Sequence, residues 1–360
     1  MKINNKHFKT IWYDKNTDKI NIINQLKLPH FFETLHMDTF DGIINAIKTM
    51  QVRGAPLIGG AAAYGVCLAI KEDSSNHNLQ NSVQLLIKTR PTAINLEHSV
   101  NRMVNAIKDI PANERYERSL LEAQKICDED IAHCKNIGIY GKKIIEEYIK
   151  QNDVEVINIL THCNAGWLAT IDWGTATSPI YHAFLEGKKI HVWVDETRPR
   201  NQGSSLTAYE LTQEGIPNTI IADNTGGMLM QKGMVDICIT GADRVLANGD
   251  VINKIGTYLK ALAACENHIP FYVALPTTTI DKKNKNIKNI VIEERHADEL
   301  TRMTGIDDKG KFTTINIYPK DSKVLNLAFD LTPAKYITNL ITELGVCEAS
   351  ENSIYDLINK

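Results

Sequence analysis

The chain has 360 residues, of which 43% are hydrophobic and 23% are charged, and this is the composition of an ordinary globular protein. Its length exceeds what one hydrophobic core usually organises, so two domains are expected. The formal net charge of -3 indicates no basic surface for nucleic acid, and the apolar runs are too short to span a membrane.

The first 150 residues are expected to form a small N-terminal domain. Residues 1–35 alternate short apolar and polar stretches around Asp14, Asn16 and Asp18, which predicts a small β-ribbon. From about Thr39 the apolar residues recur at helical spacing, and this pattern continues to about residue 150. The sequence therefore predicts a β-ribbon followed by a helical domain over 1–150.

Residues 151–360 change character, because short apolar runs rich in Val, Ile and aromatic residues now alternate with helical segments. These runs are VEVINIL, KIHVWV, TIIA, VDICIT, PFYVAL and NIVIE, the last over 289–293. Such alternation is typical of a parallel sheet covered by helices on both faces. We therefore predict an α/β catalytic domain over 151–360, with a Rossmann-like, doubly wound parallel sheet.

Ligands of such sheets bind outside the carboxyl ends of the strands, and polar residues follow five of the predicted strands there. Two of them, Cys163 and Asp243, carry groups suited to chemistry. Cys163 precedes Asn164 and Gly166, and backbone amides there would lower the pKa of its thiol; the alternative is a small buried residue. Asp243, bordered by small residues, could be desolvated enough to hold a proton and act as an acid. Its alternative is a helix cap or an ion pair with Arg244.

Several cations and polar groups could hold an anion. Arg53 precedes Gly54 and Ala55 at the start of a predicted helix, although a plain helix-helix turn explains this stretch equally well. Further candidates are Arg90 beside Pro91 and a Thr92 cap, Gln202 in a dense polar loop, and Asn253 with Lys254 before a glycine and a helix.

No metal site is expected. Cys127 and Cys134 lie seven residues apart on a predicted helix, which is not a metal-ligand spacing, and His296 has no second ligand near it in sequence. The seven cysteines are too few and too irregular for a disulfide scaffold, and no apolar signal-peptide core follows the polar start. These features indicate a cytoplasmic protein.

Six motifs in order along the chain resemble the methylthioribose-1-phosphate isomerase family, from Arg53 to about Gly345. They are RGAPLIGGAAAYG, RPTAINL, THCNAG, ETRPRNQGSSLTAYEL, GADRVLANGDVINKIGT and FDLTPAKYIT. This family of aldose-ketose isomerases is related to the regulatory subunits (α, β and δ) of translation initiation factor 2B. The resemblance implies a small N-terminal domain before a Rossmann-like domain, usually in a homodimer.

The resemblance also implies a function and a site. The reaction would convert S-methyl-5-thioribose 1-phosphate to S-methyl-5-thioribulose 1-phosphate, a step of methionine salvage, without cofactor or metal. Cys163 and Asp243 would be catalytic. The substrate-binding residues would be Arg53, Gly54, Ala55, Arg90, Gln202, Asn253 and Lys254.

This chemistry needs an acid, because a sugar 1-phosphate cannot open freely to its aldehyde. Asp243 would protonate the ring oxygen, and Cys163 would act as base or stabiliser beside C2, with hydrogen moving as a proton or as a hydride. Residues 224–227 and Glu97–His98 depart from the typical family pattern, which leaves other 5-substituents open. The alternatives are 5-deoxyribose 1-phosphate, ribose 1,5-bisphosphate, or a regulatory binding module without chemistry.

Overall fold

A computed structural model describes residues 1–90 and 93–359. The amino-terminal part begins with two small antiparallel sheets, one of two strands and one of three. Their strands are β1 (Lys2–Ile3), β2 (Lys6–His7), β3 (Ile11–Asp14), β4 (Lys19–Ile23) and β5 (Thr34–Met37). Five helices follow, namely α1 (Phe40–Lys48), α2 (Ala55–Glu72), α3 (Asn76–Thr89), α4 (Ile94–Ile107) and α5 (Arg115–Asn152).

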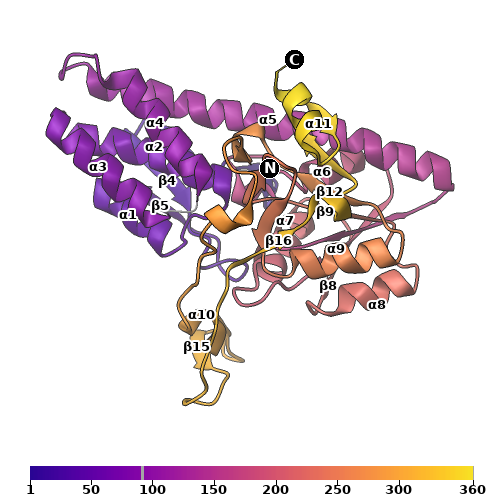
Figure 1. Cartoon of the computed structure of the whole chain (residues 1–360). Helices are drawn as coiled ribbons and strands as arrows, with labels where there is room; N and C mark the ends of the chain where they lie inside the picture. Colours follow the sequence, from indigo (N-terminus) through magenta and orange to yellow (C-terminus); the bar gives the residue numbers. More distant parts are fainter. Residues whose placement is uncertain (91–92, 360) are drawn as a thin grey trace.

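Two of these helices explain how the amino-terminal part holds together. Helix α2 is rich in Gly and Ala and is buried along nearly its whole length, which lets α4 approach closely: a Cβ on Gly59 would lie 2.8 Å from Ser99 Oγ. The 38-residue α5 extends along both the helical part and the sheet part of the molecule, as Figure 1 shows. It therefore joins the two parts.

A seven-stranded sheet forms the carboxyl-terminal part, in the order β18-β17-β12-β9-β6-β7-β8. All neighbours are parallel except β17 and β18. The strands are β6 (Ile157–Thr161), β7 (Ile190–Asp195), β8 (Asn218–Ile221), β9 (Ile237–Thr240), β12 (Phe271–Ala274), β17 (Asn339–Thr342) and β18 (Gly345–Cys347). Strand β6 is the first of the parallel strands along the chain. The next two, β7 and β8, lie on one side of it, and the later strands β9, β12 and β17 lie on the other. The strand order therefore reverses between β6 and β9, which is where doubly wound sheets bind their ligands.

Shorter elements complete this part. The remaining helices are α6 (Ser178–Leu185), α7 (Ala208–Gln213), α8 (Thr225–Gln231), α9 (Thr257–Glu266), α10 (Asp298–Thr301) and α11 (Glu351–Ile358). A second sheet, in the order β13-β10-β11-β16, has strands β10 (Arg244–Leu246), β11 (Val251–Lys254), β13 (Ile280–Asp281) and β16 (Phe329–Thr332). The hairpin of β14 (Arg302–Ile306) and β15 (Phe312–Asn316) projects from the body with α10 (Figure 1).

The predicted fold class is confirmed, with one strand wrong and several missed. Residues 290–293 of the NIVIE run form no strand; only an isolated bridge joins Glu294 to Leu327. Instead, the apolar side chains of Ile290 and Ile292 line a cavity. The sequence did not indicate β17, β18, the second sheet or the hairpin. The domain boundary near residue 150 stays a prediction. Four apolar residues from the amino-terminal part, Met1, Ile3, Ile23 and Leu28, pack into the same hydrophobic core as residues of the large sheet.

None of the helices in the described ranges combines the length and apolarity needed to cross a bilayer.

Candidate active site

One cavity brings together residues from seven separate segments. It lies at the reversal of strand order, beside the loops that follow β6 and β9 and the start of α2. Eight of the nine predicted site residues line it, namely Arg53, Gly54, Ala55, Arg90, Cys163, Gln202, Asp243 and Lys254. Because these segments are far apart in sequence, only the tertiary fold assembles them.

The start of α2 contributes a cation and free helix amides. Gly54 has φ +95°, and a Cβ there would lie 2.3 Å from Ala169 O, so the close turn requires glycine. Ala55 then opens the helix, whose first amides lack partners within the helix. Arg53 is 7% exposed and donates from both Nη atoms to Asn164, once to Oδ1 and once to the backbone oxygen at 2.7 Å.

Arg90 and Lys254 supply two further cations. Arg90 directly follows α3. Its Nη2 lies 3.5 Å from Glu293 Oε2, whereas its buried Nε and Nη1 have no partner within the described chain. Lys254 Nζ donates to Ala328 O at 3.1 Å and lies 4.7 Å above the ring of Phe329. Burial lowers the pKa of Lys254, while Cys163 and Asp243 raise it. These cations have spare donors that an anion could use.

Cys163 occupies an unusual backbone conformation, with φ +62°, two residues after the end of β6. Its amide donates to Thr197 Oγ1 at 2.8 Å, and its Sγ lies 3.7 Å from Gln202 Oε1. Burial raises the pKa of the thiol, and the opposing charges of Arg53 and Lys254 reduce this effect. The expectation of a lowered thiol pKa was therefore wrong, because desolvation outweighs the nearby amides and cations.

Asp243 lies between β9 and β10, and its amide donates to Ile252 O at 3.0 Å. Burial raises the pKa of its carboxyl, whereas Lys254, Arg90 and Arg53 act in the opposite direction. The expected desolvation is therefore present. Within the described residues, the ion pair of Arg244 Nη1 is with Asp281 Oδ2, at 3.2 Å, rather than with Asp243. An acid that keeps its proton above the usual carboxyl range suits proton donation.

Two predicted residues need a separate account. Asn253 is buried but is not among the residues lining the cavity; its Nδ2 donates to Thr257 Oγ1 at 3.0 Å and so ties β11 to α9. The Pro91–Thr92 pair, in which Thr92 was expected to cap a helix, lies outside the described residues. Its helix, α4, is preceded in the structure by Ala93.

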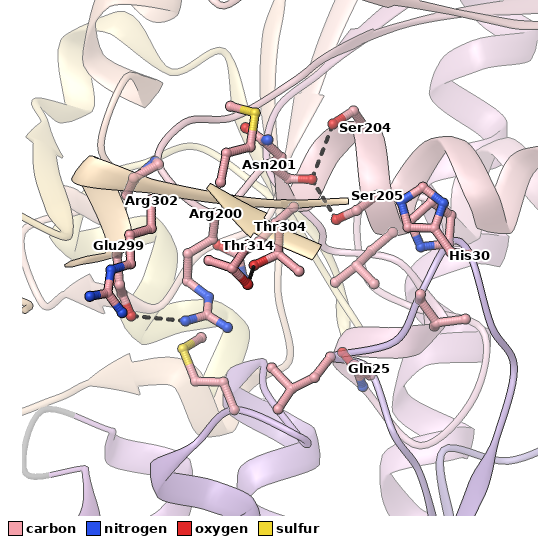
Figure 2. A pocket seen from close by; sticks show the side chains of 18 of the residues that line it. Gln25, His30, Arg200, Asn201, Ser204, Ser205, Glu299, Arg302, Thr304 and Thr314 are labelled. Carbon is pink, nitrogen blue, oxygen red and sulfur yellow. Dashed lines mark hydrogen bonds and ion pairs between the residues drawn. The ribbon is translucent and has the colours of Figure 1, made fainter. Parts of the chain in front are cut away.

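Apolar side chains close the rest of this cavity, which we call the catalytic cavity after the roles predicted for Cys163 and Asp243, and a larger outer cavity adjoins it. The apolar lining includes Met50, Ile58, Ile252, Ile290, Ile292 and Phe329. The outer cavity has a volume of about 630 Å³, against about 50 Å³ for the catalytic one, and shares Met50, Arg53 and Gln202 with it. Figure 2 shows the outer cavity, in which Arg200 contacts Glu299 at 3.0 Å and Ser204 and Ser205 both donate to Asn201 O.

Among the described residues, His162, Asp195 and Asp223 form the only group with three possible metal ligands. His162 Nδ1 lies 2.7 Å from Asp195 Oδ2 and its Nε2 lies 2.9 Å from Ile255 O, while Lys260 Nζ lies 2.7 Å from Asp195 Oδ2. A lysine ammonium therefore already occupies the position beside the carboxylate that a metal would need. These residues fit an ion-pair network better than a metal site.

Sequence reasoning missed the residues that support Arg53. Asn164 and Glu210 both lie within quoted motifs, but no local pattern links two residues 46 positions apart that bond at 2.9 Å. The two departures from the family pattern lie elsewhere: Asn224 and Gly227 line a separate cavity beside α9, and His98 lines one beside α4. Neither segment lines the catalytic cavity, so neither bears directly on the 5-substituent.

Comparisons with known proteins agree on one family. A sequence model of the initiation factor 2 subunit family matches residues 51–349. The methylthioribose-1-phosphate isomerase of Escherichia coli O45:K1 is 52% identical over 99% of this chain and 96% of its own length. The protein of that name from Methylorubrum extorquens is 51% identical over 99% and 98%.

Two solved structures are also similar. The 5-methylthioribose 1-phosphate isomerase of Pyrococcus horikoshii has a TM-score of 0.83 and 37% identity over 98% of this chain and 96% of that one. A structure described as translation initiation factor eIF-2B, subunit delta, from A. fulgidus has a TM-score of 0.80 and 39% identity, covering 98% and 100%. The likeness therefore extends over almost the whole chain.

Proposed function

This chain belongs to the initiation factor 2 subunit family, and we propose that it is the aldose-ketose isomerase that converts S-methyl-5-thioribose 1-phosphate to S-methyl-5-thioribulose 1-phosphate. The single observation that carries this proposal is the catalytic cavity itself. Cys163 and Asp243 line it together with three cations that have donors to spare. The full-length relatives that carry the name of this enzyme support the same assignment.

The proposed reaction uses these groups in defined roles. Arg53, Arg90 and Lys254 hold the phosphate, with the helix amides at Gly54 and Ala55. Asp243 gives its proton to the ring oxygen as the bond between C1 and that oxygen breaks. Hydrogen passes from C2 to C1, and the proton of the C2 hydroxyl leaves as the carbonyl forms. Cys163 accepts this proton if it is a thiolate, or, as a thiol, it stabilises the charge that develops at C2. No atoms are gained or lost, so the step requires no oxidant.

The walls of the cavity support an apolar 5-substituent. Met50, Ile292 and Phe329 would surround a methylthio group, and the contact between its sulfur and the aromatic ring of Phe329 would be favourable. A second phosphate would need unpaired cations, but Arg200 and Arg302 in the outer cavity already face carboxylates, at 3.0 Å and 3.7 Å. Ribose 1,5-bisphosphate is therefore disfavoured, and 5-deoxyribose 1-phosphate is the weaker apolar alternative.

A parallel assay tests the substrate. Methylthioribose 1-phosphate, 5-deoxyribose 1-phosphate and ribose 1,5-bisphosphate are supplied separately, with EDTA present, and ketose formation is followed by NMR. We expect turnover of the first with the highest kcat/KM, weaker turnover of the second and none of the third, all insensitive to EDTA. A folded sample that turns over none of them would instead favour a binding module, and a preference for the bisphosphate would reject the methylthio assignment.

We also propose that the enzyme works as a homodimer in the cytoplasm. The family resemblance supports the dimer. A reducing compartment is supported by the six free thiols from Cys67 to Cys265, of which Cys265 is exposed. Light scattering coupled to gel filtration should give twice the chain mass of 40.3 kDa, and a single chain mass would reject the dimer.

A further inference from the structure

The guanidinium of Arg53 is held firmly without being neutralised. Its two hydrogen bonds go to the side-chain and backbone oxygens of one residue, Asn164, and no carboxylate of the described chain forms an ion pair with it. Burial lowers the pKa of Arg53, and the nearby groups Cys163, Asp243 and Glu210 act to raise it. A fixed cation that keeps its charge is what anion binding needs.

The amide of Asn164 can take only one orientation. Its Nδ2 lies 2.9 Å from Glu210 Oε1 and 3.1 Å from Thr207 Oγ1. Burial raises the pKa of Glu210 to about 7, but its other three contacts are donors as well, so its oxygens accept from every neighbour. The Thr207 hydroxyl uses its hydrogen on Cys163 O at 2.7 Å, so it too can only accept from Asn164. The NH₂ end must therefore face Glu210, which leaves the Oδ1 end facing Arg53.

Glu210 is itself rigidly placed. It is fully buried, and besides Asn164 it accepts from Leu168 N at 2.8 Å, Trp167 N at 3.1 Å and Tyr181 Oη at 3.0 Å. A Cβ on Gly166 would lie 1.6 Å from its Oε2, so the chain leaves room for this carboxylate only by having glycine there. These contacts hold the Glu210 side chain in one position.

We propose that Asn164 and Glu210 are positioning residues that orient Arg53 toward the substrate phosphate while keeping its charge available. This inference rests on the proposed function, because it takes the phosphate as the ligand of Arg53. The neutral amide separates the carboxylate from the guanidinium, so Glu210 fixes the geometry without pairing directly with the cation. An aspartate at position 164 could neutralise Arg53, and it would also lose the hydrogen bonds to Glu210 and Thr207, because it has no N–H group to donate to them.

The test compares two variants with a matched control. In Asn164→Asp, the dissociation constant for inorganic phosphate, measured by calorimetry, should rise at least about 10-fold, as for one lost charged hydrogen bond. KM for the sugar phosphate should rise by a similar factor, while kcat changes less than about 3-fold. Glu210→Gln should act in the same direction, because an amide cannot accept from all four donors. Tyr181→Phe removes one contact of Glu210 but none of Asn164, so it should leave both constants within about 2-fold.

A double-mutant cycle separates positioning from a general structural role. In an Arg53→Ala background, Asn164→Asp and Glu210→Gln should cause no further loss of phosphate affinity, because they act only through Arg53. Equal losses in both backgrounds would overturn the inference, as would normal phosphate affinity in the single variants. A wild-type protein that binds no phosphate and turns over no substrate would instead overturn the proposed function, and the inference with it.

Discussion

At the scale of single residues, burial affects Cys163 and Asp243 in the same direction with different consequences. It raises the pKa of both groups, so at neutral pH the thiol keeps its proton and the carboxyl holds one more readily than usual. For Asp243 this favours the proposed role as an acid. For Cys163 it means that Arg53 and Lys254 must assist the loss of the proton if the thiol is to act as a base.

Replacing either catalytic side chain should abolish most activity without unfolding the protein. Cys163→Ala and Asp243→Asn should each lower kcat by at least about 100-fold, the lower range for a lost general acid or base. The melting temperature should hardly change in either variant, since neither side chain forms a strong hydrogen bond in the described chain. Steady-state kinetics and calorimetry measure both effects. Near-normal turnover would show that the affected residue has another role.

The pH dependence of kcat should reflect the ionisation of Asp243. The pKa of Asp243 is raised, so its proton is retained above the ordinary carboxyl range and is lost as pH rises through that higher pKa. Activity should therefore fall on the alkaline side of the profile. Lys254 lowers the pKa of Asp243, so Lys254→Gln should move this fall in kcat to higher pH. A shift to lower pH would argue against Asp243 as the acid.

Asp195 should stabilise the protein down to low pH. Burial alone would raise its pKa, but His162 and Lys260 outweigh this and lower it to about 2. A lowered carboxyl pKa gives stability that is complete above the unfolded value and is lost as pH falls through the folded one, here between about pH 4 and 2. This is worth on the order of 2 kcal/mol.

Acid unfolding followed by circular dichroism checks this directly. Asp195→Asn should lose that part of the pH dependence and be less stable at pH 7, because Lys260 loses its buried counter-charge and His162 loses a hydrogen-bond partner. An unchanged acid midpoint would contradict the ion-pair account.

Eight of the nine residues predicted from sequence line the same cavity, because they stand in compact motifs at strand ends and helix starts; their roles stay predictions. Asn253 was named with them, but its side chain bonds to Thr257. Asn164 and Glu210 could not be singled out, because their importance lies in one hydrogen bond between distant segments. The thiol pKa was misjudged for the same reason: burial depends on the tertiary structure.

At the scale of elements, the order of the sheet explains where the site lies. Strands β6 and β9 are adjacent, so the loops after them, which carry Cys163 and Asp243, border the same crevice. Buried parallel strands are continuous apolar runs and could be found from sequence. The NIVIE run was misjudged because its apolar residues face the catalytic cavity rather than a sheet, and short strands such as β10 and β13 give too little pattern to detect.

The turn into α2 should be intolerant of any side chain. In Gly54→Ala the new Cβ would meet Ala169 O at 2.3 Å and would also need a positive φ. Gly187→Ala is a matched control, with φ +84° and nothing within 4 Å of the new Cβ. The control should lose about 1–2 kcal/mol, the cost of the left-handed conformation.

Gly54→Ala should lose clearly more stability, and it should also raise KM, because the helix start must move away from the phosphate. Chemical denaturation measures the first effect and kinetics the second. Equal losses in the two variants would show that the contact with Ala169 does not matter.

At the scale of the whole molecule, a chain of charges connects the two halves across the site. Arg90 contacts Glu293 at 3.5 Å, Glu293 contacts Arg295 at 2.7 Å, and Arg295 and Arg200 both contact Glu299, at 2.5 and 3.0 Å. Arg90 comes from the helical half and the other four from the carboxyl-terminal half. Its weak contact with Glu293 leaves Arg90 able to turn toward a bound phosphate.

Removing Arg90 should weaken substrate binding strongly. A buried phosphate that loses one charged partner loses about 1.5–3 kcal/mol, so Arg90→Ala should raise the dissociation constant by roughly one to two orders of magnitude. Arg90→Lys should restore only part, since an ammonium lacks the planar fork. Arg200→Ala is the control, because its guanidinium is paired with Glu299 in the outer cavity. An equal effect of both alanine variants would place the phosphate elsewhere.

The left-handed backbone of Cys163 has an evolutionary consequence. A residue with a side chain is disfavoured there by about 1–2 kcal/mol, whereas glycine is not. Replacement of Cys163 by glycine would therefore remove the thiol and, at the same time, relieve the unfavourable backbone conformation. In a lineage no longer selected for turnover, this position could drift to glycine while the sheet, the cations and the anion pocket persist. Descent from a catalyst to a ligand-binding regulator would then require little more than the loss of one thiol.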